Sequence, residues 1–108
     1  MITLRVLGQL APSAAAETAL YTCATTSAVI SSLWICNTSN STPDTFTIRV
    51  NVGGAGDTAK QILFFEAPLP PNTSLPVVTG ITLANTDVIK VTSTNGTCSF
   101  SIFGQENS

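Results

Sequence analysis

The chain has 108 residues and a formal net charge of -2, which suits one domain with a modest core. Charged residues make up only 9% of it, against about 25% in an ordinary soluble domain. The four basic residues are scattered, which argues against nucleic-acid binding, and no apolar run is long enough to cross a membrane. A surface so poor in charge favours association with other copies or with a larger assembly.

The first predicted element is a strand over residues 3–10. The segment Met1–Leu10 alternates in polarity and carries Arg5, so it lacks the continuous apolar stretch of a signal peptide. We therefore expect synthesis in a cytoplasm. A strand at this position is expected to form a sheet edge or an extended arm that adds to a partner's sheet.

Alternation with a period of two continues along most of the chain and predicts further strands. The clearest case places Phe46, Ile48, Val50 and Val52 on one side of a half-buried strand. By contrast, Val29–Cys36 is bulky at both parities, which is typical of a central strand covered on both faces, with Trp34 in the core. The predicted strands after the first cover residues 17–24, 28–37, 45–52, 60–67, 74–82, 87–94 and 97–104.

Turn residues separate these strands at regular intervals. Asn95-Gly96 predicts a tight hairpin between the last two strands, and Gly53–Asp57 predicts a flexible hairpin loop. Short strands at this spacing predict an all-β fold, a single antiparallel β-sandwich over residues 1–108 with about eight strands. The sandwich is expected to be jelly-roll or immunoglobulin-like.

The residues that usually carry chemistry are scarce. The chain has no histidine, the usual general base and the commonest metal ligand. Its six acids are isolated in sequence and are interpreted as turn and strand-end residues, with Glu106 in a frayed polar tail. We therefore predict no catalytic, cofactor-binding or metal-binding residue and no enzyme activity, and we do not expect two of these acids to form a dyad in space.

The three cysteines are too far apart in sequence for a local zinc motif, and Cys36 is predicted to be buried on the central strand. Cys98 is expected on the same side of its strand as the inward Phe100, and Cys23 on the same side as Tyr21, because residues two apart in a strand share a face. A disulfide between Cys23 and Cys98 would close a loop of about 75 residues and stabilise the fold by about 4 kcal/mol. The alternative is a pair of buried free thiols, as expected in a reducing cytoplasm.

Segments along nearly the whole chain carry a resemblance to a known family. They are Leu7–Pro12, Leu20–Thr22, Ala28–Asn37, Thr45–Val50, Lys60-Gln61, Gly80–Ala84, Asp87–Val91 and Ser99–Gly104. This series resembles a family of small virion structural proteins of tailed bacteriophages. The resemblance implies a β-sandwich used in several copies on a particle and supplies no catalytic residues. Members tend to have Val at the positions of Cys23 and Cys98, and this double departure favours the disulfide.

Our first hypothesis for such a particle protein is a capsid decoration (cement) protein on the virion surface, because a rigid sandwich, a charge-poor surface and an extended N-terminal segment suit that role. Its expected partners are the major capsid protein or other virion proteins, with a homotrimer favoured. A tail fibre, neck or baseplate component is the first alternative, and a carbohydrate-binding adhesion module is the second. No cofactor, nucleic-acid or membrane partner is expected. Contacts with partners are expected in the N-terminal segment and the glycine loop, at Leu4, Val6, Leu10, Gly53, Gly54 and Asp57.

Overall fold

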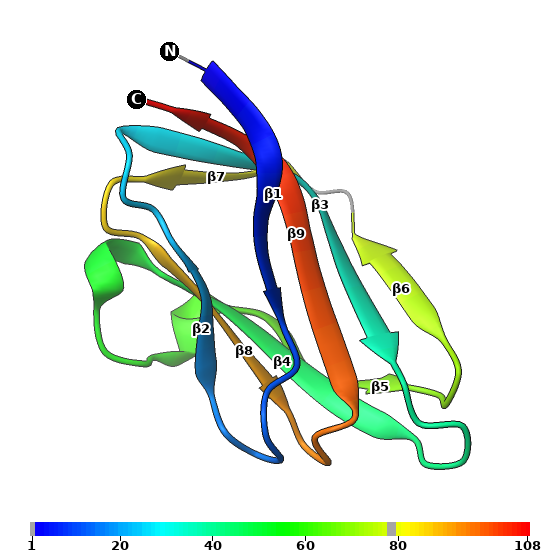
Figure 1. The fold of residues 1–108 in the computed structure, drawn as a ribbon. Helices are drawn as coiled ribbons and strands as arrows, with labels where there is room; N and C mark the ends of the chain where they lie inside the picture. The colour runs from blue at the N-terminus through cyan, green and yellow to red at the C-terminus, as the bar shows by residue number, and fades with distance from the viewer. Residues whose placement is uncertain (1, 78–79) are drawn as a thin grey trace.

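A computed structural model describes residues 2–77 and 80–108 of the chain. Within this part the chain forms nine strands and two short 3₁₀ turns (Figure 1). The strands are β1 (Ile2–Leu10), β2 (Thr18–Thr22), β3 (Ser27–Asn37), β4 (Asp44–Asn51), β5 (Ile62–Leu69), β6 (Ser74–Val77), β7 (Ile81–Ala84), β8 (Val88–Ser93) and β9 (Cys98–Asn107). The turns, η1 (Val52–Gly54) and η2 (Ala59–Gln61), lie between β4 and β5. No helix in the described residues is long and apolar enough to span a membrane.

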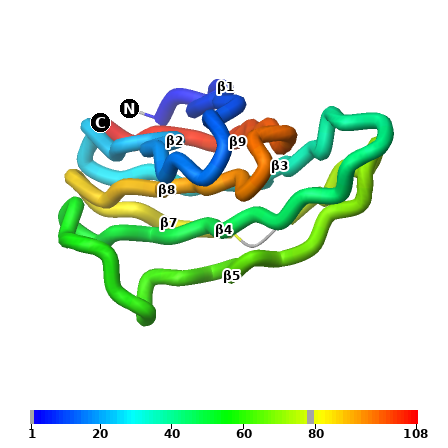
Figure 2. The backbone as a smooth tube through the Cα atoms, turned by 90° about the horizontal axis from the view of Figure 1, so that it is seen from below, coloured from blue at the N-terminus to red at the C-terminus, as the bar shows by residue number. Residues whose placement is uncertain are grey.

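The strands form two antiparallel sheets that pack face to face, which confirms the predicted β-sandwich (Figure 2). The five-stranded sheet has the order β1-β9-β3-β6, and β7 also pairs with β3. The four-stranded sheet has the order β2-β8-β4-β5. The two sheets enclose one core that contains residues from both.

The order of pairing distinguishes between the two expected topologies. Because β6 and β7 pair with the two halves of β3, they act together as one interrupted strand. The first strand then pairs with the last, the second with the last but one, the third with the interrupted strand, and the fourth with the fifth. This nested pairing is the topology of a jelly roll rather than of an immunoglobulin domain.

Two predictions about local connections are wrong. The strand predicted over residues 74–82 is divided into β6 and β7, and Gly80, just before β7, has a φ of 63° that interrupts an extended chain. Residues 78 and 79, also in this predicted strand, lie outside the described residues. Asn95-Gly96 does not close a hairpin, because β8 and β9 belong to different sheets. The turn residues fix a local reversal, but they do not determine which sheet the next strand joins.

The alternation in β3 reverses at a bulge. Ala28 and Ile30 point into the core, and after the register shift between Ile30 and Ser32 the inward residues are Leu33 and Ile35. An extra residue in one strand exchanges the two faces of everything that follows it. The predicted double covering of β3 is therefore wrong: its second parity belongs to an exposed face, and Trp34 is 43% exposed.

Aromatic rings join the two sheets at the centre of the core. Phe46 on β4 lies 5.6 Å from Phe64 and 6.4 Å from Phe100 between ring centroids, and it is fully buried. The prediction that Phe46 and Ile48 face inward is correct. It is wrong for Val52, which is exposed because β4 ends one residue earlier and the chain enters η1.

Candidate functional site: the outer face of the five-stranded sheet

The described residues bring together few groups that could do chemistry. No three or more His, Cys, Asp or Glu side chains in this part of the chain are placed to hold a metal ion. Two clusters contain ion pairs, one at the four-stranded sheet and one that joins β1, β9 and β2.

The first cluster lies at the four-stranded sheet and includes an acid pair that the sequence did not lead us to expect. Arg49 Nε lies 2.9 Å from Glu17 Oε2, and Lys90 Nζ lies 3.4 Å from Asp57 Oδ1. Partial burial and the hydrogen bond with Asp57 raise the pKa of Glu17. Hydrogen bonds from Glu17 and Asn51 lower the pKa of Asp57 to about 2. When both carboxyl groups are ionised, two cations face two anions, and the cluster is a charge-balanced network.

The second cluster joins the ends of the chain. Glu106 was expected in a frayed tail, but it lies on β9, is 8% exposed and accepts hydrogen bonds from Tyr21 and Arg5. The Tyr21 hydroxyl first, and then the Arg5 guanidinium, lower the pKa of Glu106. Burial and the Glu106 carboxylate raise the pKa of Tyr21. The sequence-based prediction failed because β1 pairs with β9 up to Ile2 and Asn107, which holds the tail in the sheet.

The structure separates the two cysteines of the proposed disulfide. The Cys23 N–H donates a hydrogen bond to the carbonyl oxygen of Asp87, just before β8. The Cys98 N–H donates to Ser93 Oγ, at the other end of β8. The length of β8 is about 17 Å at about 3.3 Å per residue, far beyond the reach of a disulfide. The structure therefore corresponds to the second of the two alternatives, with all three thiols free. Cys36 is only partly buried, because it follows the bulge in β3.

The most distinctive surface is the outer face of the five-stranded sheet. We use the name "outer face" for the side chains of β1, β9 and β3 that point away from the core. The register places Val6 opposite Phe103 and Leu4 opposite Gln105, so these side chains share one face. Exposure is high for β1, with 61% for Ile2, 76% for Leu4 and 49% for Val6. The face is thus apolar along β1.

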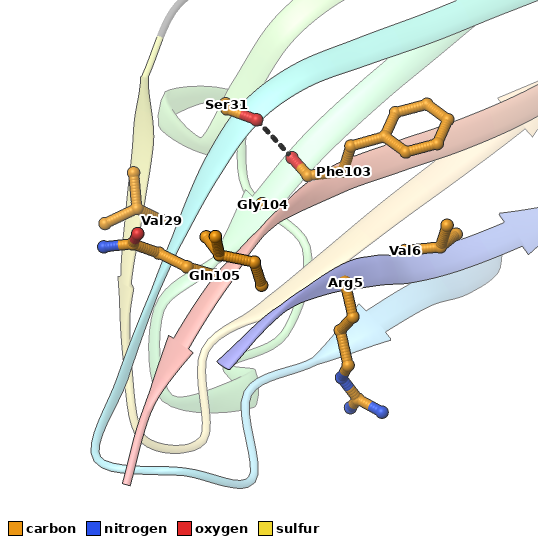
Figure 3. Close-up of a pocket in the computed structure, with 8 residues that line it drawn as sticks. Arg5, Val6, Val29, Ser31, Phe103, Gly104 and Gln105 are labelled. Carbon is orange, nitrogen blue, oxygen red and sulfur yellow. Dashed lines mark hydrogen bonds between the residues drawn. The ribbon is translucent and has the colours of Figure 1, made fainter. Parts of the chain in front are cut away.

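A shallow groove of about 560 Å³ runs along this outer face (Figure 3). Ser31 lies at the bulge of β3, and its Oγ donates a hydrogen bond to the carbonyl oxygen of Phe103, 3.0 Å away. Gly104, which has no side chain, also lines the groove. The groove is lined by Leu4, Arg5, Val6, Val29, Ser31, Phe103, Gly104 and Gln105.

The predicted contact residues are divided by the structure. Leu4 and Val6 lie on the outer face, whereas Leu10 packs against the core. The glycine loop lies against β8 of the other sheet: the Gly53 N–H donates to Asp87, and Gly54 is also in η1. Asp57 belongs to the charge-balanced network.

Two outer-face residues, Trp34 and Phe103, were not among the predicted contacts. Trp34 was assigned to the core, because the bulge that turns it outward has no clear mark in the sequence. Phe103 could have been found, since it breaks the alternation set by the inward Phe100 and Ile102. An aromatic residue at the wrong parity of a regular strand indicates either a bulge or an exposed apolar contact.

No protein-family model matches this chain, and no curated protein matches it.

Proposed function

We propose that the chain is a non-catalytic structural protein of a tailed-phage particle, and that it acts as a capsid decoration protein on the head shell. One observation supports this proposal above the others. This observation is the exposed apolar outer face. Apolar surface in contact with water is unfavourable, so a face of this kind is typical of a site that binds another protein.

Both the exposure of this face and the low charge of the chain favour binding to a protein shell. Ile2, Leu4 and Val6 keep about half or more of their surface in water, so a protein partner that covers them gains apolar burial. The low charge of the chain reduces electrostatic repulsion between the protein and a crowded shell. The charges of the Glu17 and Asp57 network are balanced internally and add little to that repulsion.

The fold also suits a protein that holds neighbouring capsid subunits together. A jelly roll is a recurrent fold of viral capsid proteins, and its two sheets share a continuous core here. The outer face lies on strands rather than on loops, so its side chains are held by the sheet register. A rigid face loses little conformational freedom when it binds.

The experiment that tests this proposal measures the number of copies of the chain in purified particles, by quantitative mass spectrometry against the major capsid protein. A decoration protein is expected in hundreds of copies per particle. A few dozen copies would instead indicate a tail fibre, neck or baseplate component. Absence from the particle would contradict a virion role altogether.

A second candidate, a carbohydrate-binding adhesion module, is favoured by the exposure of Trp34. A tryptophan that is 43% exposed on a sheet face can stack on a sugar ring, and jelly rolls also occur among lectins. If this function is correct, sugar titration will change the fluorescence of Trp34, the single tryptophan, and Trp34→Ala will abolish binding on a glycan array. Phe65→Ala, at an exposed aromatic on β5, is the matched control. No signal on the array would remove this candidate.

A further inference from the structure

The free edge of β1 differs from the other sheet edges in the described part of the chain. The edge strand β2 is short and has a register break between Ala19 and Tyr21. The edge strand β5 contains Pro68 and a left-handed Glu66. The remaining edge is split between β6 and β7, and β6 contains Pro76. Short edges, bulges and prolines prevent edge-to-edge pairing, whereas β1 has nine residues and no proline.

The open part of this edge is the segment Ile2–Val6. After it, the register of β1 shifts between Val6 and Gly8. At Gly8 the strand lies close to β2, because a Cβ there would be only 2.6 Å from the carbonyl oxygen of Leu20. The second half of β1 is thus packed against the neighbouring sheet, and the five residues before it remain available for pairing.

We propose that the edge of Ile2–Val6 pairs with the same segment of a second copy of this chain. The two strands run antiparallel about a two-fold axis that passes through Leu4. Leu4 then faces Leu4 of the second copy, and Ile2 faces its Val6. Two identical edges can form such an isologous contact, because each copy uses the same segment and no second complementary surface is needed. Backbone hydrogen bonds between the two edges supply much of the affinity.

The side chains select this register. Directly opposite residues must share a face, so a pairing that set Leu4 against Arg5 is excluded. A centre at Arg5 would place two like charges opposite each other, which is destabilising. A centre at Leu4 sets Arg5 against Thr3 and pairs every residue of the open segment.

The pairing makes the two five-stranded sheets continuous and joins their outer faces into one apolar surface. The assembly has two-fold symmetry, in place of the trimer expected from the sequence. This inference is independent of the capsid proposal. A chain that is dimeric in solution and absent from phage particles would retain the pairing and lose the proposed function.

The first test is the mass of the protein in solution, by analytical ultracentrifugation. The expected value is twice the 11.2 kDa of one chain. Leu4→Arg is expected to return it to a monomer, because two arginines would meet at the axis. Phe65→Arg is the matched control, since Phe65 is similarly exposed on the irregular edge strand β5, and this variant is expected to remain dimeric. Far-UV circular dichroism checks that both variants fold.

The second test is disulfide cross-linking in a Cys36→Ser background, where the remaining native thiols are buried. Leu4→Cys is expected to cross-link to a covalent dimer on mild oxidation. Val6→Cys is expected to cross-link much more slowly, because Val6 faces Ile2. A monomer or a trimer in solution, a dimer that survives Leu4→Arg, or faster cross-linking at Val6→Cys than at Leu4→Cys would overturn the proposal. A monomer that binds a capsid protein through Ile2–Val6 would overturn it too, and would leave the capsid function standing.

Discussion

Asp44→Ala is expected to lower the free energy of unfolding by about 3–4 kcal/mol, a large part of the 5–15 kcal/mol typical of a small domain. The Asp44 carboxylate is 2% exposed and accepts hydrogen bonds from the N–H groups of Thr45, Asn95 and Thr97 and from the hydroxyls of Ser93 and Thr97. Removing the carboxylate leaves these donors without their acceptor inside the protein. Urea denaturation of the wild type and the variant measures the difference.

The acid dependence of stability gives this prediction a second readout. Burial acts to raise the pKa of Asp44, but the hydrogen bonds from Ser93, Asn95, Thr45 and Thr97 outweigh it and lower the pKa from 3.8 to about 2. A lowered pKa means that the stabilisation is complete above the unfolded value and is lost as the pH falls from about 4 to 2. The loss is about 2 kcal/mol. Asp44→Asn, which cannot titrate, should lack this component when its pH profile is subtracted from that of the wild type.

Asp87 provides the control for the Asp44 experiment. Its carboxylate is also mostly buried, but it accepts only the N–H groups of Gly53 and Ala84 among the hydrogen bonds described. Asp87→Ala is therefore expected to lower the free energy of unfolding by clearly less than Asp44→Ala does. If the two alanine variants lose equal stability, the number of donors around Asp44 is not the cause.

Gly104→Ala is expected to destabilise the fold by about 3 kcal/mol or more. Gly104 lies on β9 between Arg5 of β1 and Ile30 of β3. A Cβ there would lie 2.0 Å from the carbonyl oxygen of Val29 and 3.0 Å from the Cα of Ile30. These are backbone atoms of a paired strand, so β3 and β9 would have to separate. Thermal and urea unfolding measure the loss.

Gly56→Ala is the control for this substitution, because a Cβ at Gly56 would meet nothing within 4 Å. Its effect is expected to lie within about 0.5 kcal/mol of the wild type. A Gly104→Ala protein as stable as the Gly56→Ala protein would show that β3 can move away from β9 at little cost. The sheet would then be easily deformed where β3 approaches Gly104.

The role of Asp44 shows why the last connection was misjudged from the sequence. Asn95-Gly96 indicates a reversal, and a reversal does occur there. The Asp44 carboxylate at the start of β4 binds the N–H groups of Asn95 and Thr97, and so holds the loop that carries the chain from one sheet to the other. Asp44 and Asn95 are about 50 residues apart in the chain, a distance at which local turn propensity carries no information.

The bulge of β3 shows a second limit. Up to Ile30 and after Ser32 the strand alternates regularly, yet a reader of the sequence sees apolar residues at both parities and infers two covered faces. The extra residue is accommodated against Gly104 of β9, which has no Cβ to obstruct it. Both Trp34 and Cys36 were misplaced for this one reason. A glycine inside a strand often marks such a close approach.

The class of the fold and the low charge of its surface could be predicted from the amino-acid sequence alone. Alternation of polarity places Phe46, Ile48, Phe100 and Ile102 in a core, because side chains of a strand alternate between its two faces. Composition likewise determined that few groups capable of acid–base or metal chemistry are present, since that count needs no coordinates. The edge position of β1 was also expected from its place in the chain.

Which segments meet could not be predicted without the folded chain. It selected the jelly-roll order, brought Glu106 to Arg5 and Tyr21, separated Cys23 from Cys98 along β8, and turned Trp34 outward. These outcomes depend on pairings between distant residues and on a one-residue bulge, and each changes the faces or ends that side chains share. Local propensity contains no information about either the distant pairings or the bulge. The extent of the open edge, Ile2–Val6, likewise follows from the register shift in the pairing of β1 with β9 and from the approach of Gly8 to β2.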